Sequence, residues 1–219
     1  MGIKERLVEL KSSLPKTVTL VAVSKTKPVT DLMEAYNAGQ RVFGENKVQE
    51  MAEKYQQMPK DIQWHMIGHL QRNKVKYMAE FVDLIHSVDS LKLLTEINKQ
   101  AKKYNRVIYC LLQIKIATED TKFGLTKEDA IALLNSDQFQ DLNHIHISGV
   151  MGMASFTSET SQIKTEFEYL KNTFNTLKKI QPEVEIISMG MSGDYQLAIG
   201  CGSTMIRIGS HIFGARNYT

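Results

Sequence analysis

A lysine at the end of an apolar run is the first residue of this sequence that could do chemistry. Residues 18–25 are nearly continuous in apolar and β-branched side chains, and the run ends in Lys25. A lysine amine held partly out of water has a lowered pKa and can attack a carbonyl carbon to form a Schiff base. The alternative is a solvated lysine that marks the exit of a strand, and position alone leaves both open. Lys27 would point the other way on a continued strand and add a nearby positive charge.

A Gly/Ser/Thr-rich stretch between Ser188 and Ser210 is the second candidate. It contains residues 189–194 (MGMSGD), 200–204 (GCGST) and 207–210 (RIGS). Small residues before short helices expose backbone N–H groups, and hydroxyls add further donors, so the stretch suits a phosphate group. Ordinary turns have the same composition. The sequence has no Walker pattern, and Gly200-x-Gly202 lacks the third glycine of a dinucleotide-binding fingerprint.

The histidines and cysteines favour neither a metal site nor nucleophilic catalysis. His144 and His146 have the spacing of two metal ligands on one strand face, but they lie where a strand begins. Cys110 and Cys201 have no recognisable neighbouring base, and Cys110 lies inside a predicted strand, where core packing is its expected role. We therefore expect no metal site.

The composition excludes several classes of protein. The 219 residues are 42% hydrophobic and 23% charged, which is typical of a globular domain. The excess of 27 basic over 24 acidic residues gives a net charge of only +3, too little to indicate nucleic-acid binding. No apolar run approaches the roughly 18 residues of a spanning helix, no signal peptide is present, and two cysteines cannot form a disulfide framework. We expect a reduced cytoplasmic protein that binds no membrane, with residues 1–219 as a single domain and a monomer as the default state.

The elements that position these candidates alternate along the chain. Short apolar runs predict strands at residues 18–25, 41–44, 63–68, 84–88, 107–115, 146–151, 185–189 and 205–209. Helical patterns lie between them at residues 47–57, 73–80, 91–104, 127–135, 159–180 and 195–199, and a further helix after Pro28 has Thr30 as its expected N-cap and stops at Gly39. The clearest helix has Ile163, Phe167, Leu170, Phe174 and Leu177 on one face.

Eight strands alternating with helices predict a closed (β/α)8 TIM barrel, with a doubly wound open sheet as the rival. Residues 3–14 are expected to form an extra helix that closes the bottom of the barrel. Chemistry in such barrels takes place at the carboxyl ends of the strands, and phosphate sites follow strands seven and eight. Lys25 and the Gly/Ser-rich loops both fall at such positions.

Several motifs together resemble the pyridoxal 5′-phosphate homeostasis protein family. They are residues 21–28 (VAVSKTKP), 43–46 (FGEN) with Gln49 and Glu50, 64–74 (WHxIGxLQxNK), Lys122 with Gly124, Gly149 with Met151, 189–194 (MGMSxD) and 202–216 (GSTMIRIGxxIFGxR). They follow the family's order and spacing from about Val18 to Tyr218, which is essentially the whole chain.

The resemblance implies a barrel similar to the N-terminal domain of alanine racemase and pyridoxal 5′-phosphate (PLP) bound as a Schiff base on Lys25. By the same comparison Arg207 faces the pyridine nitrogen, and Asn46 lies near the ring. The residues matched to the phosphate-binding part of the site are Ser192, Ser203, Thr204, Gly209 and Ser210.

A PLP enzyme acting on amino acids needs an electron sink and a base for the α-proton. An arginine at the ring nitrogen keeps its proton, so the ring stays neutral and is a weak sink. In alanine racemase a second base comes from an additional β-domain, and we expect none here because Thr219 follows directly after the eighth βα unit. A non-catalytic PLP-binding homeostasis protein, with PLP-dependent apoenzymes as candidate recipients, is therefore favoured over a racemase-type enzyme. A protein–protein adaptor is a third possibility.

Overall fold

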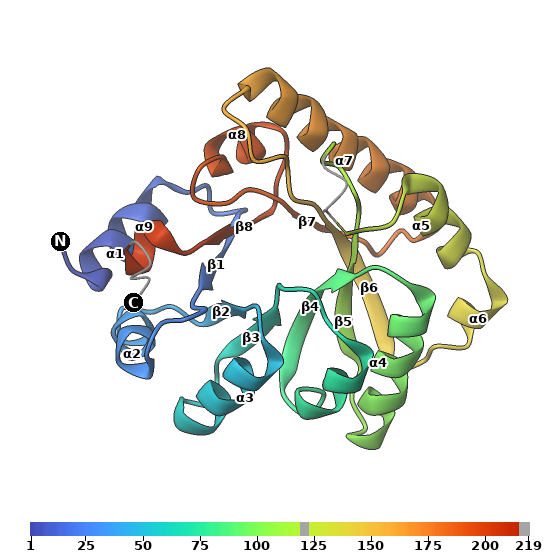
Figure 1. Ribbon diagram of the computed structural model, residues 1–219, viewed down its shortest axis with the longest axis horizontal. Helices are drawn as coiled ribbons and strands as arrows, with labels where there is room; N and C mark the ends of the chain where they lie inside the picture. The colour runs from blue at the N-terminus through green and yellow to red at the C-terminus, as the bar shows by residue number, and fades with distance from the viewer. Residues whose placement is uncertain (119–122, 215–219) are drawn as a thin grey trace.

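Eight parallel strands close into a barrel in chain order, and the eighth strand pairs with the first (Figure 1). The computed structural model describes residues 1–118 and 123–214, so Lys122 and Arg216 of the motifs lie outside the described residues. The strands are β1 (Thr19–Val23), β2 (Val42–Glu45), β3 (Gln63–Met66), β4 (Val82–Val88), β5 (Ile108–Gln113), β6 (Ile145–Met151), β7 (Ile186–Ser188) and β8 (Met205–Ile208). The predicted (β/α)8 barrel is confirmed, and the open sheet is excluded.

The helices surround the barrel on the outside (Figure 1). They are α1 (Ile3–Ser13), α2 (Val29–Asn37), α3 (Val48–Gln57), the 3₁₀ helix η1 (Arg72–Tyr77), α4 (Leu91–Lys103), α5 (Lys127–Leu134), α6 (Asp137–Gln140), α7 (Thr160–Ile180), α8 (Tyr195–Gly200) and α9 (Ser210–Phe213). Each predicted helix is present. The four-residue helices α6 and α9 escaped prediction because one turn is too short to show a period. No helix of the described residues is long and apolar enough to cross a membrane.

Helix α1 does not close the bottom of the barrel, contrary to the sequence-based expectation. It packs in the outer layer against α2 and α9, on the left of Figure 1. Arg6 Nε of α1 donates a hydrogen bond of 2.7 Å to the carbonyl oxygen of Ile212 in α9. Because α9 is only one turn long, α1 covers the side of the barrel that a full eighth helix would cover.

The N-cap prediction for α2 is also wrong. The helix begins at Val29 with Pro28 as its N-cap, so Thr30 lies in the first turn and caps nothing. Pro28 has a φ of −69° and an extended ψ of 157°. The proline ring fixes φ near this value, so proline suits the position before the first helical residue without a side-chain cap.

The buried apolar side chains form two clusters, one between the strands and the helices and one inside the barrel. The larger core lies between strands and helices and includes the predicted stripe of α7, all of which is buried. Cys110 is buried in this core, as its place in a strand predicted. A smaller cluster contains Val21, Leu84, Leu111 and Met205. Because side chains alternate along a strand, Ile206 and Ile208 face the outer core while Arg207 faces the interior.

Candidate functional site

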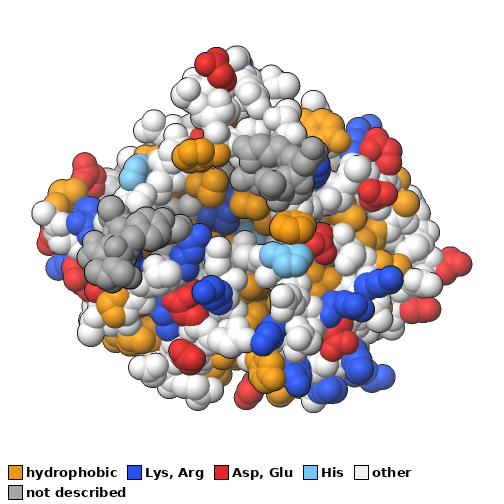
Figure 2. All heavy atoms as spheres, viewed as in Figure 1, with side chains coloured by type: hydrophobic (Ala, Val, Ile, Leu, Met, Phe, Trp, Pro, Cys, Tyr) orange, Lys and Arg blue, Asp and Glu red, His pale blue; other side chains and the backbone are white. Residues whose placement is uncertain are grey.

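A cavity of about 410 Å³ opens at the carboxyl ends of the strands. Its lining comes from the segments that follow β1, β2, β3, β6, β7 and β8. The face in Figure 2 is hollowed near its centre, with hydrophobic and basic side chains beside the hollow. This volume lies within the usual range for small-molecule sites. Six of the predicted site residues line the cavity: Lys25, Asn46, Ser192, Arg207, Gly209 and Ser210.

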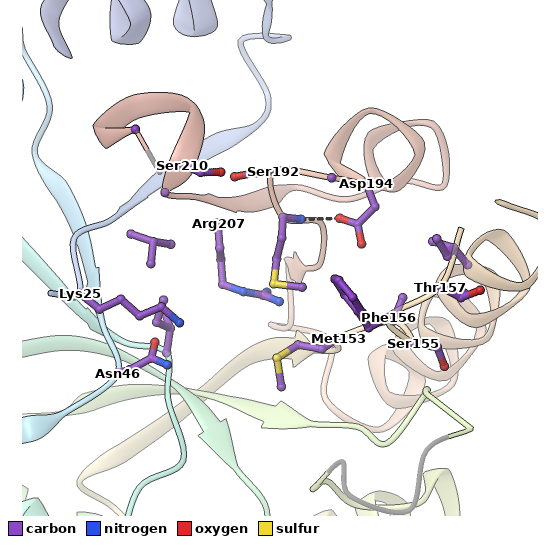
Figure 3. A pocket seen from close by; sticks show the side chains of 18 of the residues that line it. Lys25, Asn46, Met153, Ser155, Phe156, Thr157, Ser192, Asp194, Arg207 and Ser210 are labelled. Atoms are coloured by element: carbon purple, nitrogen blue, oxygen red, sulfur yellow. Dashed lines mark hydrogen bonds between the residues drawn. The ribbon is translucent and has the colours of Figure 1, made fainter. Parts of the chain in front are cut away.

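The six residues are arranged around the cavity rather than clustered at one point. Figure 3 shows the hydroxyls of Ser192 and Ser210 facing each other along one edge. Lys25 and Asn46 lie together across the cavity, and the guanidinium of Arg207 lies between the two groups. The arrangement offers an amine at one end and hydroxyl donors at the other, with a fixed cation in the middle. It suits a planar molecule that carries both an electrophilic carbon and an anionic group.

Arg207 is held by three hydrogen bonds deep in the cavity. Its Nη1 donates to the carbonyl oxygen of Ser188 at 2.9 Å and to Ser188 Oγ at 2.6 Å, and its Nη2 donates to the carbonyl oxygen of Gly152 at 3.1 Å. Burial lowers the pKa of Arg207 to about 10, against the opposing influence of Asp194. The guanidinium therefore keeps its proton at neutral pH and can only donate hydrogen bonds.

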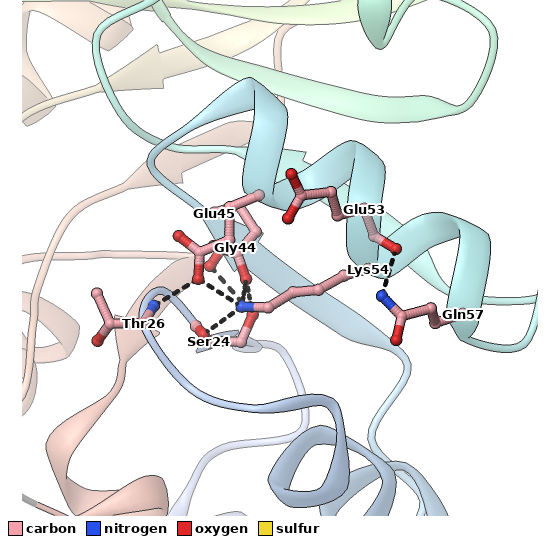
Figure 4. A network of polar contacts seen from close by, with 8 residues as sticks. Ser24, Thr26, Gly44, Glu45, Glu53, Lys54 and Gln57 are labelled. Atoms are coloured by element: carbon pink, nitrogen blue, oxygen red, sulfur yellow. Dashed lines mark hydrogen bonds and ion pairs between the residues drawn. The ribbon is translucent and has the colours of Figure 1, made fainter.

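The loop that carries Lys25 rests on a largely buried ion cluster, which we call the Lys54 cluster and which consists of Ser24, Glu45, Glu50 and Lys54. Figure 4 shows Ser24, Glu45 and Lys54 of this cluster. Lys54 Nζ lies 2.7 Å from Glu45 Oε1, 2.7 Å from Glu50 Oε1 and 2.8 Å from the carbonyl oxygen of Ser24. Ser24 Oγ donates to Glu45 Oε1 at 2.6 Å. Burial raises the pKa of Glu45, although Lys54 acts in the opposite direction.

The Lys54 cluster fixes the backbone on both sides of Lys25. Ser24 is held from one side, and the N–H of Thr26 donates to Glu50 Oε1 at 2.6 Å on the other. Thr26 has a φ of +64°, a left-handed conformation that a β-branched residue rarely adopts. These contacts hold the tight turn that directs the half-buried Lys25 side chain into the cavity.

Ser203 and Thr204, the other two residues matched to phosphate binding, are not among the residues that line the cavity. Both precede β8, and their hydroxyls are bound to main-chain groups. Ser203 Oγ donates to the carbonyl oxygen of Met189 at 2.7 Å, and Thr204 Oγ1 accepts from the N–H of Ile187 at 2.9 Å. They hold β7 and β8 together, so their part of the Gly/Ser-rich stretch is a structural turn.

Lys27 is a second lysine of the cavity lining. The expectation that Lys27 would point away from Lys25 was wrong, because residues two apart on a strand share a face and because β1 already ends at Val23. Its Nζ donates a hydrogen bond of 3.0 Å to the carbonyl oxygen of Phe213. The cavity therefore has two amines, and their different surroundings allow an experiment to separate them.

Several residues that support the site could not be identified from the sequence. Glu45 and Glu50 belong to the family motifs but had no assigned role, and a lysine in a charged helix such as Lys54 is normally solvated.

Among residues 1–118 and 123–214 no three His, Cys, Asp or Glu side chains gather as a metal site. The ring of His144 contacts the carbonyl oxygen of Arg106 at 3.2 Å.

Comparisons of sequence place the chain among known proteins. Residues 2–217 match the family described as "Alanine racemase, N-terminal domain". The pyridoxal phosphate homeostasis protein of Pasteurella multocida (strain Pm70) is 42% identical over 207 residues, which cover 92% of this chain and 88% of that protein. The protein of the same name from Schizosaccharomyces pombe (strain 972) is 40% identical over 207 residues, covering 92% of this chain and 85% of that protein.

Solved structures agree with the sequence comparisons. PipY of Synechococcus elongatus PCC7942, solved without PLP, superimposes with a TM-score of 0.92 at 37% identity, covering 97% of this chain and all of PipY. PipY with PLP bound gives a TM-score of 0.88 at 36% identity. Alanine racemase of Clostridium difficile 630 gives 0.77 at 14% identity, covering 98% of this chain and 57% of the racemase. At that identity the racemase shares the fold alone.

Proposed function

We propose that this chain, which belongs to the pyridoxal phosphate homeostasis protein family, binds PLP in the cavity at the carboxyl end of the barrel and serves PLP homeostasis. One observation carries the proposal: Lys25, Arg207 and two serine hydroxyls, far apart in the sequence, line a single cavity. A relative of 36% identity has been solved with PLP bound, which supports the same ligand here.

The residues present fit PLP at three points. The Lys25 nitrogen would bond to the aldehyde carbon, and the aldehyde oxygen would leave as water. The Arg207 guanidinium would donate to the ring nitrogen, while the hydroxyls of Ser192 and Ser210 would hold the phosphate with the main chain at Gly209. A Cβ at position 209 would lie 3.2 Å from the carbonyl oxygen of Val23, so glycine lets this turn pack closely against β1. Asn46, beside Lys25, would border the ring.

We further propose that PLP is held without turnover. Bound PLP supplies an electron sink, but only a protonated ring nitrogen makes it a strong one. Arg207 keeps its proton because its pKa of about 10 lies far above neutral, so the ring would stay unprotonated. The names of the relatives support a homeostasis role. A racemase-type enzyme is the alternative, and it predicts rapid exchange of the α-proton when single amino-acid enantiomers are incubated in deuterated water.

Borohydride reduction of the protein with PLP, followed by mass mapping, tests the assignment of Lys25. The modified peptide should contain Lys25, and the Lys25→Ala variant should lose nearly all modification, with a weak substitute at Lys27. The matched control Lys27→Ala should keep the modification at Lys25. Modification mainly at Lys27 or Lys115 in the unaltered protein would contradict the assignment.

Comparison of PLP with pyridoxal tests the phosphate-binding edge. Pyridoxal lacks the phosphate and should bind orders of magnitude more weakly, because several charge-assisted hydrogen bonds of roughly 1.5–3 kcal/mol each are lost. Ser192→Ala and Ser210→Ala should each weaken binding of PLP but leave pyridoxal nearly unaffected. Equal affinity for PLP and pyridoxal would exclude this edge as the phosphate site.

The assembly and setting of the protein are also part of the proposal. We propose a monomer in the cytoplasm, where its two free cysteines stay reduced, that supplies PLP to PLP-dependent apoenzymes. The lining of the cavity includes the exposed side chains of Met191 and Phe156, and we propose that bound PLP leaves past them. Light scattering of the purified protein, with and without PLP, checks the monomer.

A further inference from the structure

A chain of polar side-chain contacts, three hydrogen bonds and one longer contact between a histidine and a carboxylate, crosses the interior of the barrel beneath Arg207. Ser188 Oγ lies 2.6 Å from Arg207 Nη1 and 3.0 Å from His86 Nδ1. His86 Nε2 lies 3.0 Å from His65 Nδ1, and His65 Nε2 lies 3.6 Å from Asp83 Oδ2. Arg207, Ser188, His86 and His65 are buried, whereas the Asp83 side chain is 42% exposed. The chain thus runs from the proposed PLP site toward solvent at the other end of the barrel, and we call it the histidine relay.

The chemistry of its members gives the histidine relay one direction. Arg207 can only donate hydrogen bonds, so Ser188 Oγ accepts one from it. The hydrogen of the Ser188 hydroxyl must then point to a different acceptor. The His86 Nδ1 atom faces this hydroxyl and accepts a hydrogen bond from it, so the hydrogen of neutral His86 is on Nε2. His86 then donates to His65 Nδ1, and the His65 hydrogen is on Nε2, facing Asp83. Each polar atom along the path meets a partner of the opposite kind.

Both histidines must be neutral for this arrangement. Burial lowers the pKa of His86 well below its ordinary value, and the neighbouring His65 and Arg207 lower it further. Burial also lowers the pKa of His65, against the opposing effect of Asp83. A proton added at His65 Nδ1 would face the N–H at His86 Nε2, and a proton added at His86 Nδ1 would deprive the Ser188 hydroxyl of its acceptor.

We propose that Ser188 and His86 are positioning residues for Arg207, through a relay whose direction Arg207 imposes as far as Asp83. The role in PLP binding rests on the proposed function, because it requires Arg207 to contact bound PLP. Without an acceptor at position 86, the Ser188 hydroxyl would compete with the guanidinium for the same main-chain oxygens. Arg207 would then lose its shortest hydrogen bond and be held less firmly, by its bonds to the carbonyl oxygens of Ser188 and Gly152 alone.

The direction of the relay is tested on the protein without PLP. Nitrogen-15 NMR of histidine side chains distinguishes a hydrogen on Nδ1 from one on Nε2, and single His→Gln variants assign the signals. His86 and His65 should each be a single Nε2–H tautomer at neutral pH. In Ser188→Ala, His86 should become a mixture of tautomers. A mixture or an Nδ1–H form at His86 in the unaltered protein would overturn the relay, whatever the protein binds.

Its positioning role is tested with PLP titrations. His86→Leu removes the acceptor and should weaken PLP binding about tenfold, the effect of one lost hydrogen bond, and should shift the visible absorption band of bound PLP. His86→Asn puts an amide oxygen near the place of Nδ1 and should restore both values. His146→Leu, at the amino end of the barrel and outside the relay, is the matched control and should change neither.

Ser188→Ala is the second variant, because it removes one small hydroxyl and keeps the core volume, should His86→Leu fail to fold. It should weaken binding to the same degree as His86→Leu. Unchanged affinity and spectrum in the folded variants would overturn the positioning role. If the unaltered protein does not bind PLP, the proposed function fails, and the NMR result still decides the relay.

Discussion

The Lys54 cluster and the histidine relay support two residues of the same cavity, Lys25 and Arg207, in different ways. Under Lys25 the support is ionic: one buried ammonium joins two carboxylates and a carbonyl oxygen. Under Arg207 it is a line of neutral groups that ends in a carboxylate. The first pulls three segments of chain together around one atom, whereas the second orients a side chain over a distance. The turn at Lys25 has no strand pairing of its own and needs contacts that hold its backbone. Arg207 lies on β8, so only its side chain has to be oriented.

The two supports also differ in the sign of their pH dependence. Burial raises the pKa of Glu45, so the folded protein binds a proton more readily there than the unfolded chain does. Its contribution to the free energy of unfolding is therefore lost as the pH rises above about 4.5, the ordinary value for glutamate. Burial lowers the pKa of His65 and His86, so their contribution is present above about 6.5 and is lost as the pH falls below it.

Removal of the central ammonium should have the largest effect on stability. Lys54→Met leaves Glu45 and Glu50 without their cation, and the free energy of unfolding should fall by about 3–5 kcal/mol in denaturant titrations. The control is Lys164→Met, which breaks an exposed pair with Glu168 3.8 Å away and should change stability by less than about 0.5 kcal/mol. A similar small loss in both variants would show that the ionic support is not required for folding.

Removal of the neutral acceptor should cost less. His86→Leu leaves the buried hydroxyl of Ser188 without its acceptor, so the free energy of unfolding should fall by about 1–3 kcal/mol. Double variants should be additive, because the two supports share no residue. A larger loss of stability in His86→Leu than in Lys54→Met would contradict the conclusion that the ionic support contributes more to folding than the neutral one.

The histidine pair should make the protein less stable in mild acid. The free energy of unfolding should fall as the pH drops below about 6.5, because the unfolded chain then binds protons at both histidines more readily than the folded protein does. His86→Asn should remove about half of this decline, whereas Glu45→Gln should leave it in place. Denaturant titrations between pH 5 and 8 measure the slopes, and equal slopes in all three proteins would contradict the assignment.

The smallest effect should come from the turn itself. Thr26→Gly relieves the left-handed conformation at φ +64° and keeps the N–H that binds Glu50. The gain should be no more than about 1 kcal/mol, because glycine also adds freedom to the unfolded chain. Thermal unfolding measures it, and Thr30→Gly in the first turn of α2 should instead destabilise.

Local sequence patterns were enough to predict most of the fold. Apolar runs and helical periods depend on neighbouring residues, so the eight strands and the long helix α7 could be located from the sequence. The one-turn helix α9 could not be located in this way. The position of α1 could not be predicted either, because α1 packs where α9 is too short to cover the barrel. The rule that barrel chemistry lies at strand ends also placed Lys25 and Arg207 in one region before their contacts were known.

The sequence by itself therefore located the alternating strands and helices and placed Lys25 and Arg207 at strand ends, and the family resemblance added the barrel and the ligand. Only the tertiary structure decided that Lys54 is buried, that Ser203 and Thr204 hold strands together, and that the histidines of β3 and β4 reach Ser188 of β7. The reason is physical. Burial and hydrogen-bond partners depend on which strands face one another across the closed barrel, and no local spacing of residues encodes those long-range neighbours.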